Sequence, residues 1–218
     1  KFYETGIEHG TITAEIKDKS FEITSLRKDL ITDGRHAQVE FTNDWREDAS
    51  RRDFSINAIY ADLNGNIFDP YNGFDHLKSG KIEFIGDADK RIKEDYLRIL
   101  RYIRFFSAYS KQDHNPKIKK IIKQNIEGIS NLSKERLIGE LKKLILSNVI
   151  VKISSDSFLK ELLILIFPQL INLNKLNKLN KHANESIENK DFIFLLALLI
   201  IDGTDNAFYF LYKYNVSK

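Results

Sequence analysis

The chain has 218 residues, 42% of them hydrophobic, with 34 basic against 31 acidic side chains and a net charge of +3. This length is enough for one large or two small cores, and the charge permits an anionic partner without selecting one. The absence of cysteine excludes disulfides, thiolate metal sites and a cysteine nucleophile.

The longest apolar run, residues 192–201, is shorter than the ~20 residues that a helix needs to cross a bilayer. We therefore predict no membrane association and, with no signal peptide visible, a cytoplasmic location. The chain does not begin with Met, so we expect it to be part of a longer product.

The first predicted elements form a β-hairpin within residues 11–26. Two apolar runs there are separated by the polar residues 17–20, a pattern typical of paired strands. Glu22 lies in the second strand, where a carboxylate usually faces solvent.

A helix is predicted to begin near Thr42 or Asn43, with acidic residues in its first turn. The run RRDFSINA at residues 51–58 then places two guanidiniums, a carboxylate and an amide before an apolar strand. Asn64-Gly65 separates two short strands and favours a hairpin with a type I′ turn.

From residue 88 onward the hydrophobic period is helical, with no further strand signal. Lys117, Lys119 and Lys120 belong to a basic stretch around Pro116. A solvated lysine face is the usual explanation for such a stretch, and a track for an RNA backbone is the alternative.

The run EDYLRILRYIRF at residues 94–105 predicts one helix with two faces. One face gathers Tyr96, Ile99, Leu100, Ile103 and Phe106, which we expect to pack. The other face carries Asp95, Arg98 and Arg101, with Arg104 at its border. A solvated face with an i,i+3 ion pair is the usual reading, but the excess of Arg suits phosphates or flat ring edges.

Asp95 and Arg98 together have the chemistry to select nucleobases. A carboxylate only accepts and a guanidinium only donates hydrogen bonds. Cytosine and adenine each present an amino donor beside a ring-nitrogen acceptor, whereas uracil and guanine present a carbonyl beside an N–H. The pair therefore matches C and A and mismatches U and G.

These motifs resemble the head and neck of class II tRNA nucleotidyltransferases, the CCA-adding enzymes, and their bacterial poly(A) polymerase relatives. The match is ordered over residues 6–147 and rests on residues 34–87 and 94–105. The resemblance implies an α+β fold, in which a partial, palm-like nucleotidyltransferase head with a mixed sheet (residues 1–86) precedes an all-α neck (87–150) and a truncated helical body (151–218).

The resemblance also implies roles for particular residues. Glu22 would be a catalytic carboxylate and a ligand of Mg²⁺, beside two metal-binding aspartates. Arg52 would contact the triphosphate of ATP or CTP, with Asp53 and Asn57 at the sugar or in a structural network. Asp95 and Arg98 would read the base, while Arg101 and Arg104 would hold helix geometry and phosphate.

One part of the family pattern is missing. The family's Asp-x-Asp pair, whose carboxylates hold two Mg²⁺ ions, has no counterpart upstream of Glu22. Asp87-Ala88-Asp89 lies too late in the chain and is interpreted as a loop or helix cap. Alone, the chain is therefore expected to bind nucleotide poorly and to transfer none.

The leading hypothesis is addition of CMP and AMP to the 3′ end of tRNA, from CTP and ATP. Poly(A) synthesis from the same pocket is the alternative within the enzyme class. Outside it, the chain could be a non-catalytic RNA-binding remnant, or half of a split enzyme that needs a separately encoded amino-terminal fragment.

Overall fold

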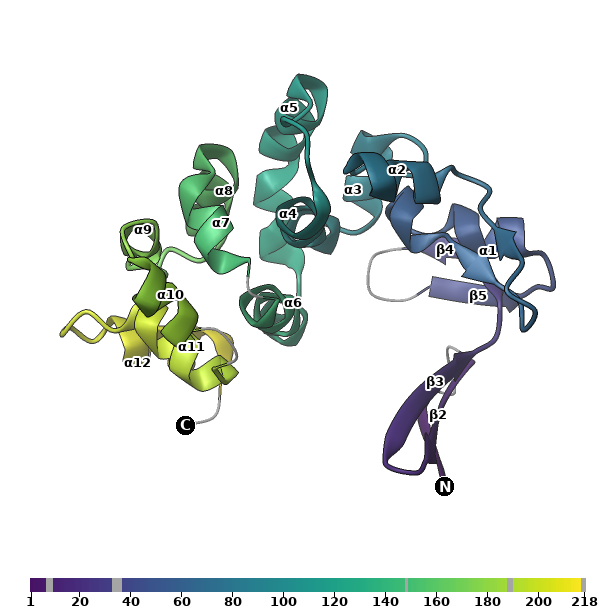
Figure 1. Cartoon of the computed structure of the whole chain (residues 1–218), viewed down its shortest axis with the longest axis horizontal. Helices are drawn as coiled ribbons and strands as arrows, with labels where there is room; N and C mark the ends of the chain where they lie inside the picture. Colours follow the sequence, from purple (N-terminus) through teal and green to yellow (C-terminus); the bar gives the residue numbers. More distant parts are fainter. Residues whose placement is uncertain (7–9, 33–36, 148, 188–189, 217–218) are drawn as a thin grey trace. The chain divides into compact units, whose positions relative to one another are not determined.

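The computed structural model describes residues 1–6, 10–32, 37–147, 149–187 and 190–216 (Figure 1). The chain divides into two compact units, the first made of residues 1–76 and 83–87 and the second of residues 77–82 and 88–218. Small sheets and short helices build the first unit, and helices build the second, which confirms the predicted α+β class. The separate neck and body domains stay a prediction.

Three strands form an antiparallel sheet at the start of the first unit, in the order β1-β2-β3. They are β1 (Phe2–Gly6), β2 (Thr11–Ile16) and β3 (Lys19–Thr24). The predicted hairpin is thus confirmed as β2 and β3. Its two-residue loop, Lys17 and Asp18, has φ values of 48° and 62°, and a type I′ turn requires this positive sign at both positions.

The register of this sheet separates an apolar face from a polar one. Phe2 pairs with Ala14 and Ala14 with Phe21, while Ile12 pairs with Ile23. Paired residues share a face and alternate residues share a face, so these side chains and Ile16 lie together. Phe2 is 69% exposed, and Ile16, Phe21 and Ile23 are also exposed. Glu22 and Thr13, which pair with each other, lie on the other face, whereas Lys19 pairs with Ile16 at the end of the apolar face.

The rest of the first unit supports the RRDFSINA run. A second antiparallel pair, β4 (Arg27–Thr32) and β5 (Ala37–Phe41), precedes α1 (Trp45–Ser50), the short 3₁₀ helix η2 (Ser55–Asn57), and the strands β6 (Tyr60–Ala61) and β7 (Ile67–Phe68). Asp44, not Thr42 or Asn43, is the N-cap of α1, and its carboxylate accepts from the Arg46 N–H. Helix α2 (Gly73–Ser79) belongs to both units.

The hairpin predicted around Asn64-Gly65 is confirmed as β6 and β7, but the type I′ turn is wrong. Gly65 has a φ of 84°, whereas Asn64 does not have the positive φ that this turn demands. The Asp62 carboxylate instead accepts from the backbone N–H groups of Asn64 and Asn66, each at 2.8 Å. This side chain organises a longer loop, as Asx turns do.

Ten α-helices and one 3₁₀ helix follow in the described part of the second unit. They are α3 (Ala88–Glu94), α4 (Leu97–Tyr109), α5 (Pro116–Asn125), η3 (Ile126–Asn131), α6 (Lys134–Leu146), α7 (Ile150–Ser155), α8 (Ser157–Ile166), α9 (Leu173–Leu176), α10 (Lys181–Ile187), α11 (Phe192–Ile200) and α12 (Asn206–Tyr214), where η3 is of the 3₁₀ type. Helix α4 packs against α6, α7 and α8, and Ile99, Leu100 and Ile103 are fully buried there as predicted.

The single helix predicted at residues 94–105 is wrong at its start. Helix α3 ends at Glu94 and α4 begins at Leu97. Asp95 lies in the junction, where its Oδ1 accepts from the Leu97 N–H at 3.1 Å. The packed side is also wider than predicted, because Tyr102 and Phe105 are buried while Tyr96 and Phe106 are half-buried.

Candidate functional site

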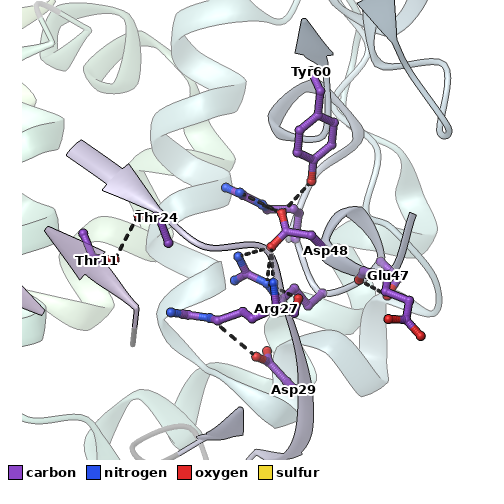
Figure 2. Close-up of polar contacts among 10 residues, drawn as sticks. Thr11, Thr24, Arg27, Asp29, Glu47, Asp48 and Tyr60 are labelled. Atoms are coloured by element: carbon purple, nitrogen blue, oxygen red, sulfur yellow. Dashed lines mark hydrogen bonds and ion pairs between the residues drawn. The ribbon is translucent and has the colours of Figure 1, made fainter. Parts of the chain in front are cut away.

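Asp48, on α1, is the centre of one cluster of polar side chains in the first unit (Figure 2). Its Oδ1 accepts from Arg51 Nη2 at 2.6 Å, and its Oδ2 from Arg52 Nη2 at 2.9 Å and from the Tyr60 hydroxyl at 2.7 Å. The Arg27 backbone N–H lies 3.3 Å from Oδ1. Asp48 is 1% exposed, so this one buried carboxylate fixes two neighbouring guanidiniums.

The electrostatics of this cluster follow from those contacts. Burial alone would raise the pKa of Asp48, but the hydrogen bonds from Tyr60, Arg51 and Arg52 lower that pKa to about 2. Burial and the bond to Asp48 raise the pKa of Tyr60 to about 12. Asp48 is therefore ionised and Tyr60 is neutral at neutral pH.

Arg52 keeps access to solvent although it is held in place. Its side chain is 38% exposed, against 14% for Arg51, and its guanidinium lies 5.9 Å from the centre of the Tyr60 ring. The predicted contact of Arg52 with a triphosphate stays a prediction. The role of Asp48 was missed, although its spacing of three and four residues from the two arginines was a signal for it.

Asp53 and Asn57 form a pair beside this cluster. Asp53 Oδ1 accepts from Asn57 Nδ2 and from the Phe54 N–H, each at 2.9 Å, and Asp53 is 6% exposed. These bonds fix the loop that enters η2 and are the structural network named as one alternative for this pair. Contact of either residue with a sugar stays a prediction.

Glu22 lies on an exposed strand, and the described residues do not complete a metal site around it. Among them, no three His, Asp or Glu side chains gather in a way that could hold a metal ion. Mg²⁺ prefers six oxygen ligands in octahedral geometry, so a single exposed carboxylate does not fit it. The role of Glu22 in catalysis and metal binding stays a prediction.

In the second unit, Asp95 is fixed from two directions. The Leu97 N–H binds its Oδ1, and Arg136 Nη2, from α6, binds its Oδ2 at 2.7 Å. The Asp95 side chain is 22% exposed. Since each carboxylate oxygen has two acceptor positions, both oxygens of Asp95 can accept a further hydrogen bond.

Arg98 is fixed by a separate set of partners. Its Nη1 donates to Glu94 Oε2 at 2.8 Å and to the Arg91 carbonyl at 2.5 Å. Arg98, on the predicted polar side of this helix, is therefore not free, because its side chain is 12% exposed and forms an ion pair with Glu94. No hydrogen bond joins its Nη2 or Nε to another residue of the described part, so these donors face no protein acceptor there.

Arg104 and Arg101 have surroundings different from those of Arg98. Arg104 Nε donates to Oε1 of the buried Glu140 at 2.6 Å, and its guanidinium lies 4.2 Å from the Phe105 ring centre. Arg101 lies 5.3 Å from the same ring centre. If Arg104 holds the geometry of α4, as predicted, Glu140 is the residue through which it does so. Contact of either arginine with phosphate stays a prediction.

The three lysines predicted to bind RNA lie on α5. Lys117 and Lys120 are exposed, and the half-buried Lys119 places its Nζ 5.0 Å from the Phe158 ring centre. No feature of the described residues separates an RNA track from a solvated face, so this contact stays a prediction.

Asp95 and Arg98 thus lie at one helix junction, while Arg52, Asp53 and Asn57 belong to the segment from the end of α1 to the end of η2 in the other unit. Glu140 fixes Arg104 and Arg136 fixes Asp95. Neither contact was predicted from the sequence. In the described ranges, no helix is long and apolar enough to cross a membrane.

The chain is similar in sequence to several known proteins. Residues 1–83 match the poly A polymerase head domain. The human protein named CCA tRNA nucleotidyltransferase 1, mitochondrial, is 49% identical over 145 residues, which are 66% of this chain and 33% of the human one. The CCA-adding enzyme of Lactobacillus helveticus is 40% identical over 146 residues, 66% of this chain and 36% of its own.

The fold is also similar to that of a solved structure. The CCA-adding enzyme of Bacillus stearothermophilus, crystallised with CTP, superposes with a TM-score of 0.61 and 25% identity, covering 92% of this chain and 57% of that one. The chain spans about a third of the length of the curated relatives it matches.

Proposed function

We propose that this chain, a member of the family of CCA tRNA nucleotidyltransferases and poly(A) polymerases, takes part in adding CMP and AMP to the 3′ end of tRNA. The substrates would be CTP and ATP, and the tRNA 3′-hydroxyl would attack the α-phosphate. The contacts of Asp95 and Arg98 at the junction of α3 and α4 carry the proposal.

Each of these two side chains is oriented by its own partners. Asp95 is held by Arg136 and the Leu97 N–H, and Arg98 by Glu94 and the Arg91 carbonyl. An acceptor and a donor that are fixed before the base arrives lose little conformational entropy on binding. This favours recognition of the amino group and ring nitrogen of C and A.

The phosphates would be bound by arginines. Arg52 presents a partly exposed guanidinium whose far side is anchored to Asp48, and a planar fork of N–H groups suits phosphate oxygens. Arg101 would add positive charge near the base, while Arg104 would keep α4 fixed to α6 through Glu140. Lys117, Lys119 and Lys120 would follow the RNA backbone.

Catalysis would require metal-binding carboxylates in addition to Glu22. Glu22 alone does not fit Mg²⁺, and residues 1–21 contain no Asp-x-Asp pair. The exposed apolar face of the sheet β1-β2-β3 supports a covering partner, because small sheets need a packed hydrophobic face to be stable in water. We expect a separately encoded amino-terminal fragment with the Asp-x-Asp pair to cover this face.

Incorporation of labelled CTP into a tRNA that lacks its CCA end tests this proposal. The chain alone should show no incorporation, and addition of a fragment with the Asp-x-Asp pair should restore it. Activity of the chain alone would show that the metal carboxylates are present after all. If ATP alone were incorporated in the restored assembly, the poly(A) alternative would replace CCA addition.

Competition among the four triphosphates in the restored assembly tests base selection separately. Asp95→Asn and Arg98→Gln should each lose roughly 1–3 kcal/mol of preference for CTP and ATP over UTP and GTP. Asp89→Asn is the matched control, since Asp89 forms a comparable ion pair with Lys93 on α3. Unchanged selectivity in both variants would exclude the role in base selection.

The cytoplasmic location is also part of the proposal. Relatives of this chain include proteins named as mitochondrial, so imaging of the tagged full-length product in its own cells is the deciding measurement.

A further inference from the structure

A pocket of about 440 Å³ lies in the second unit, apart from the junction that holds Asp95 and Arg98. Its lining comes from η3, the start of α6, the end of α8 and the end of α12. The volume falls in the range of small-molecule sites, ~300–1,000 Å³. Nothing in the proposed nucleotide chemistry uses this pocket.

The interior of the pocket is apolar and its charged groups are mainly amines. Six aliphatic residues contribute to the lining, namely Ile126, Ile129, Leu132, Leu137, Leu165 and Ile166. Lys134 and Lys213 also line it, against one carboxylate, that of Glu127. Neither amine has an acidic partner among the described residues, and the Lys213 Nζ lies 5.1 Å from the Tyr214 ring centre. The formal charge around the pocket is therefore positive.

We propose that this pocket binds a small amphiphilic carboxylate, with its aliphatic chain on the isoleucines and leucines and its carboxylate near Lys134 and Lys213. An aliphatic chain gains free energy in proportion to the apolar area that it buries. A carboxylate at the amines forms charge-assisted hydrogen bonds. A neutral or cationic chain of the same length gains only the first of these contributions.

The position of the pocket gives its occupant a route to the helix junction. Gly128 belongs to η3, one wall of the pocket, and a Cβ atom on Gly128 would collide with the Tyr96 ring. Tyr96 follows Asp95 directly and is the N-cap residue of α4. A ligand that moves η3 would therefore press on the residue beside Asp95.

Calorimetric titration of the full chain with decanoate, kept at concentrations where it is monomeric, tests the proposal without relying on nucleotide activity. Decanoate should bind, and decanol and decylamine should bind at least severalfold more weakly. Lys134→Gln and Lys213→Gln should each weaken decanoate binding about two- to fivefold, as expected for partly exposed charge pairs. The double variant should weaken it about tenfold.

Lys178→Gln is the matched control, because Lys178 is an exposed amine that does not line the pocket. It should bind decanoate as the unchanged chain does. Equal affinities for decanoate and decanol, no effect of the double variant, or no binding at all would each overturn the proposal. Loss of tRNA affinity in the two pocket variants, without decanoate binding, would make these lysines RNA contacts instead.

Discussion

Arg136, on α6, donates a hydrogen bond to Asp95, 41 positions earlier in the chain, across 2.7 Å. The contact joins a residue proposed to read the base to a helix that carries none of the other proposed base contacts. With the Leu97 N–H on its other oxygen, Asp95 has one defined orientation. The accuracy of base selection should therefore depend on a residue that does not touch the base.

Arg136→Gln tests this dependence. The pair is only partly buried, with the two side chains 30% and 22% exposed, so its loss should lower the free energy of unfolding by less than about 1 kcal/mol. The preference for CTP over UTP should fall about tenfold, because Asp95 loses the partner that orients it. Competition binding and urea denaturation measure the two effects.

Arg136→Lys is the informative second variant, because it keeps the charge but not the planar fork of donors. It should recover part of the selectivity. A large loss of stability in Arg136→Gln with unchanged selectivity would mean that this contact only holds α6 to the junction.

Acid should destabilise the first unit through Asp48. Its pKa in the folded chain, about 2, is lower than the ordinary value of 3.8, so ionised Asp48 stabilises the fold above about pH 4. That stabilisation should be lost as the pH falls from about 4 towards 2. The shift corresponds to about 2 kcal/mol, measurable by urea denaturation across this range.

Asp48→Asn should remove most of this acid dependence and cost roughly 3 kcal/mol at neutral pH, because the buried partner of two guanidiniums is lost. Asp62→Asn is the control, since Asp62 also has a lowered pKa but is exposed in a loop. An unchanged acid transition in Asp48→Asn would contradict the assignment.

The local elements of the fold were predictable because their signals are local. Alternation over residues 11–24 specifies a strand pair, and apolar residues three and four apart specify the helices after residue 88. The break between α3 and α4 was not predictable, because the helical pattern continues through Asp95. What ends the helix is the side chain of Asp95, bound to the Leu97 N–H and to Arg136.

The contacts within the candidate site were also not predictable from local sequence patterns. From the sequence alone, Asp48 is an ordinary acidic residue near the start of a helix, where the macrodipole favours negative charge. Its actual role depends on Tyr60 and on the Arg27 backbone, which the fold brings from two strands. Sequence patterns gave the residue types of the site, whereas the partners that orient them come from contacts over long sequence distances.

Tyr102→Phe should destabilise the second unit through His114. The Tyr102 hydroxyl lies 3.0 Å from His114 Nδ1, and His114 Nε2 lies 2.8 Å from Asp156 Oδ2. Burial, with Asp156 nearby, raises the pKa of Tyr102 well above its usual value, so the hydroxyl stays protonated. In the tautomer whose Nε2–H donates to the Asp156 carboxylate, Nδ1 is the acceptor and the Tyr102 hydroxyl donates to it. Its removal leaves Nδ1 unsatisfied, at a cost of about 1–3 kcal/mol.

Tyr214→Phe makes the same chemical change at another buried tyrosine, whose hydroxyl reaches the Ile166 carbonyl at 3.3 Å. This longer bond should contribute less, so Tyr214→Phe should lower the free energy of unfolding by at most about 1 kcal/mol. Urea denaturation of both variants gives the comparison, and equal losses would show that the Tyr102–His114 bond adds nothing beyond an ordinary hydroxyl contact.

Two glycine substitutions in neighbouring helices should have opposite effects. A Cβ atom at Gly139, in the middle of α6, would meet no atom within 4 Å. Gly139→Ala should therefore raise the free energy of unfolding by about 0.5–1 kcal/mol, the difference in helix propensity. At Gly128, in η3, the added methyl would collide with the Tyr96 ring.

Gly128→Ala should lower the free energy of unfolding by about 1–3 kcal/mol, as overpacking does. Because the displaced ring belongs to the residue after Asp95, Gly128→Ala should also reduce the preference for CTP over UTP, whereas Gly139→Ala should leave it unchanged. Denaturation and competition binding of the two variants separate these effects. If Gly128→Ala were as stable and selective as the unchanged chain, η3 would not control the position of Tyr96, and the route from the pocket to the helix junction would be excluded.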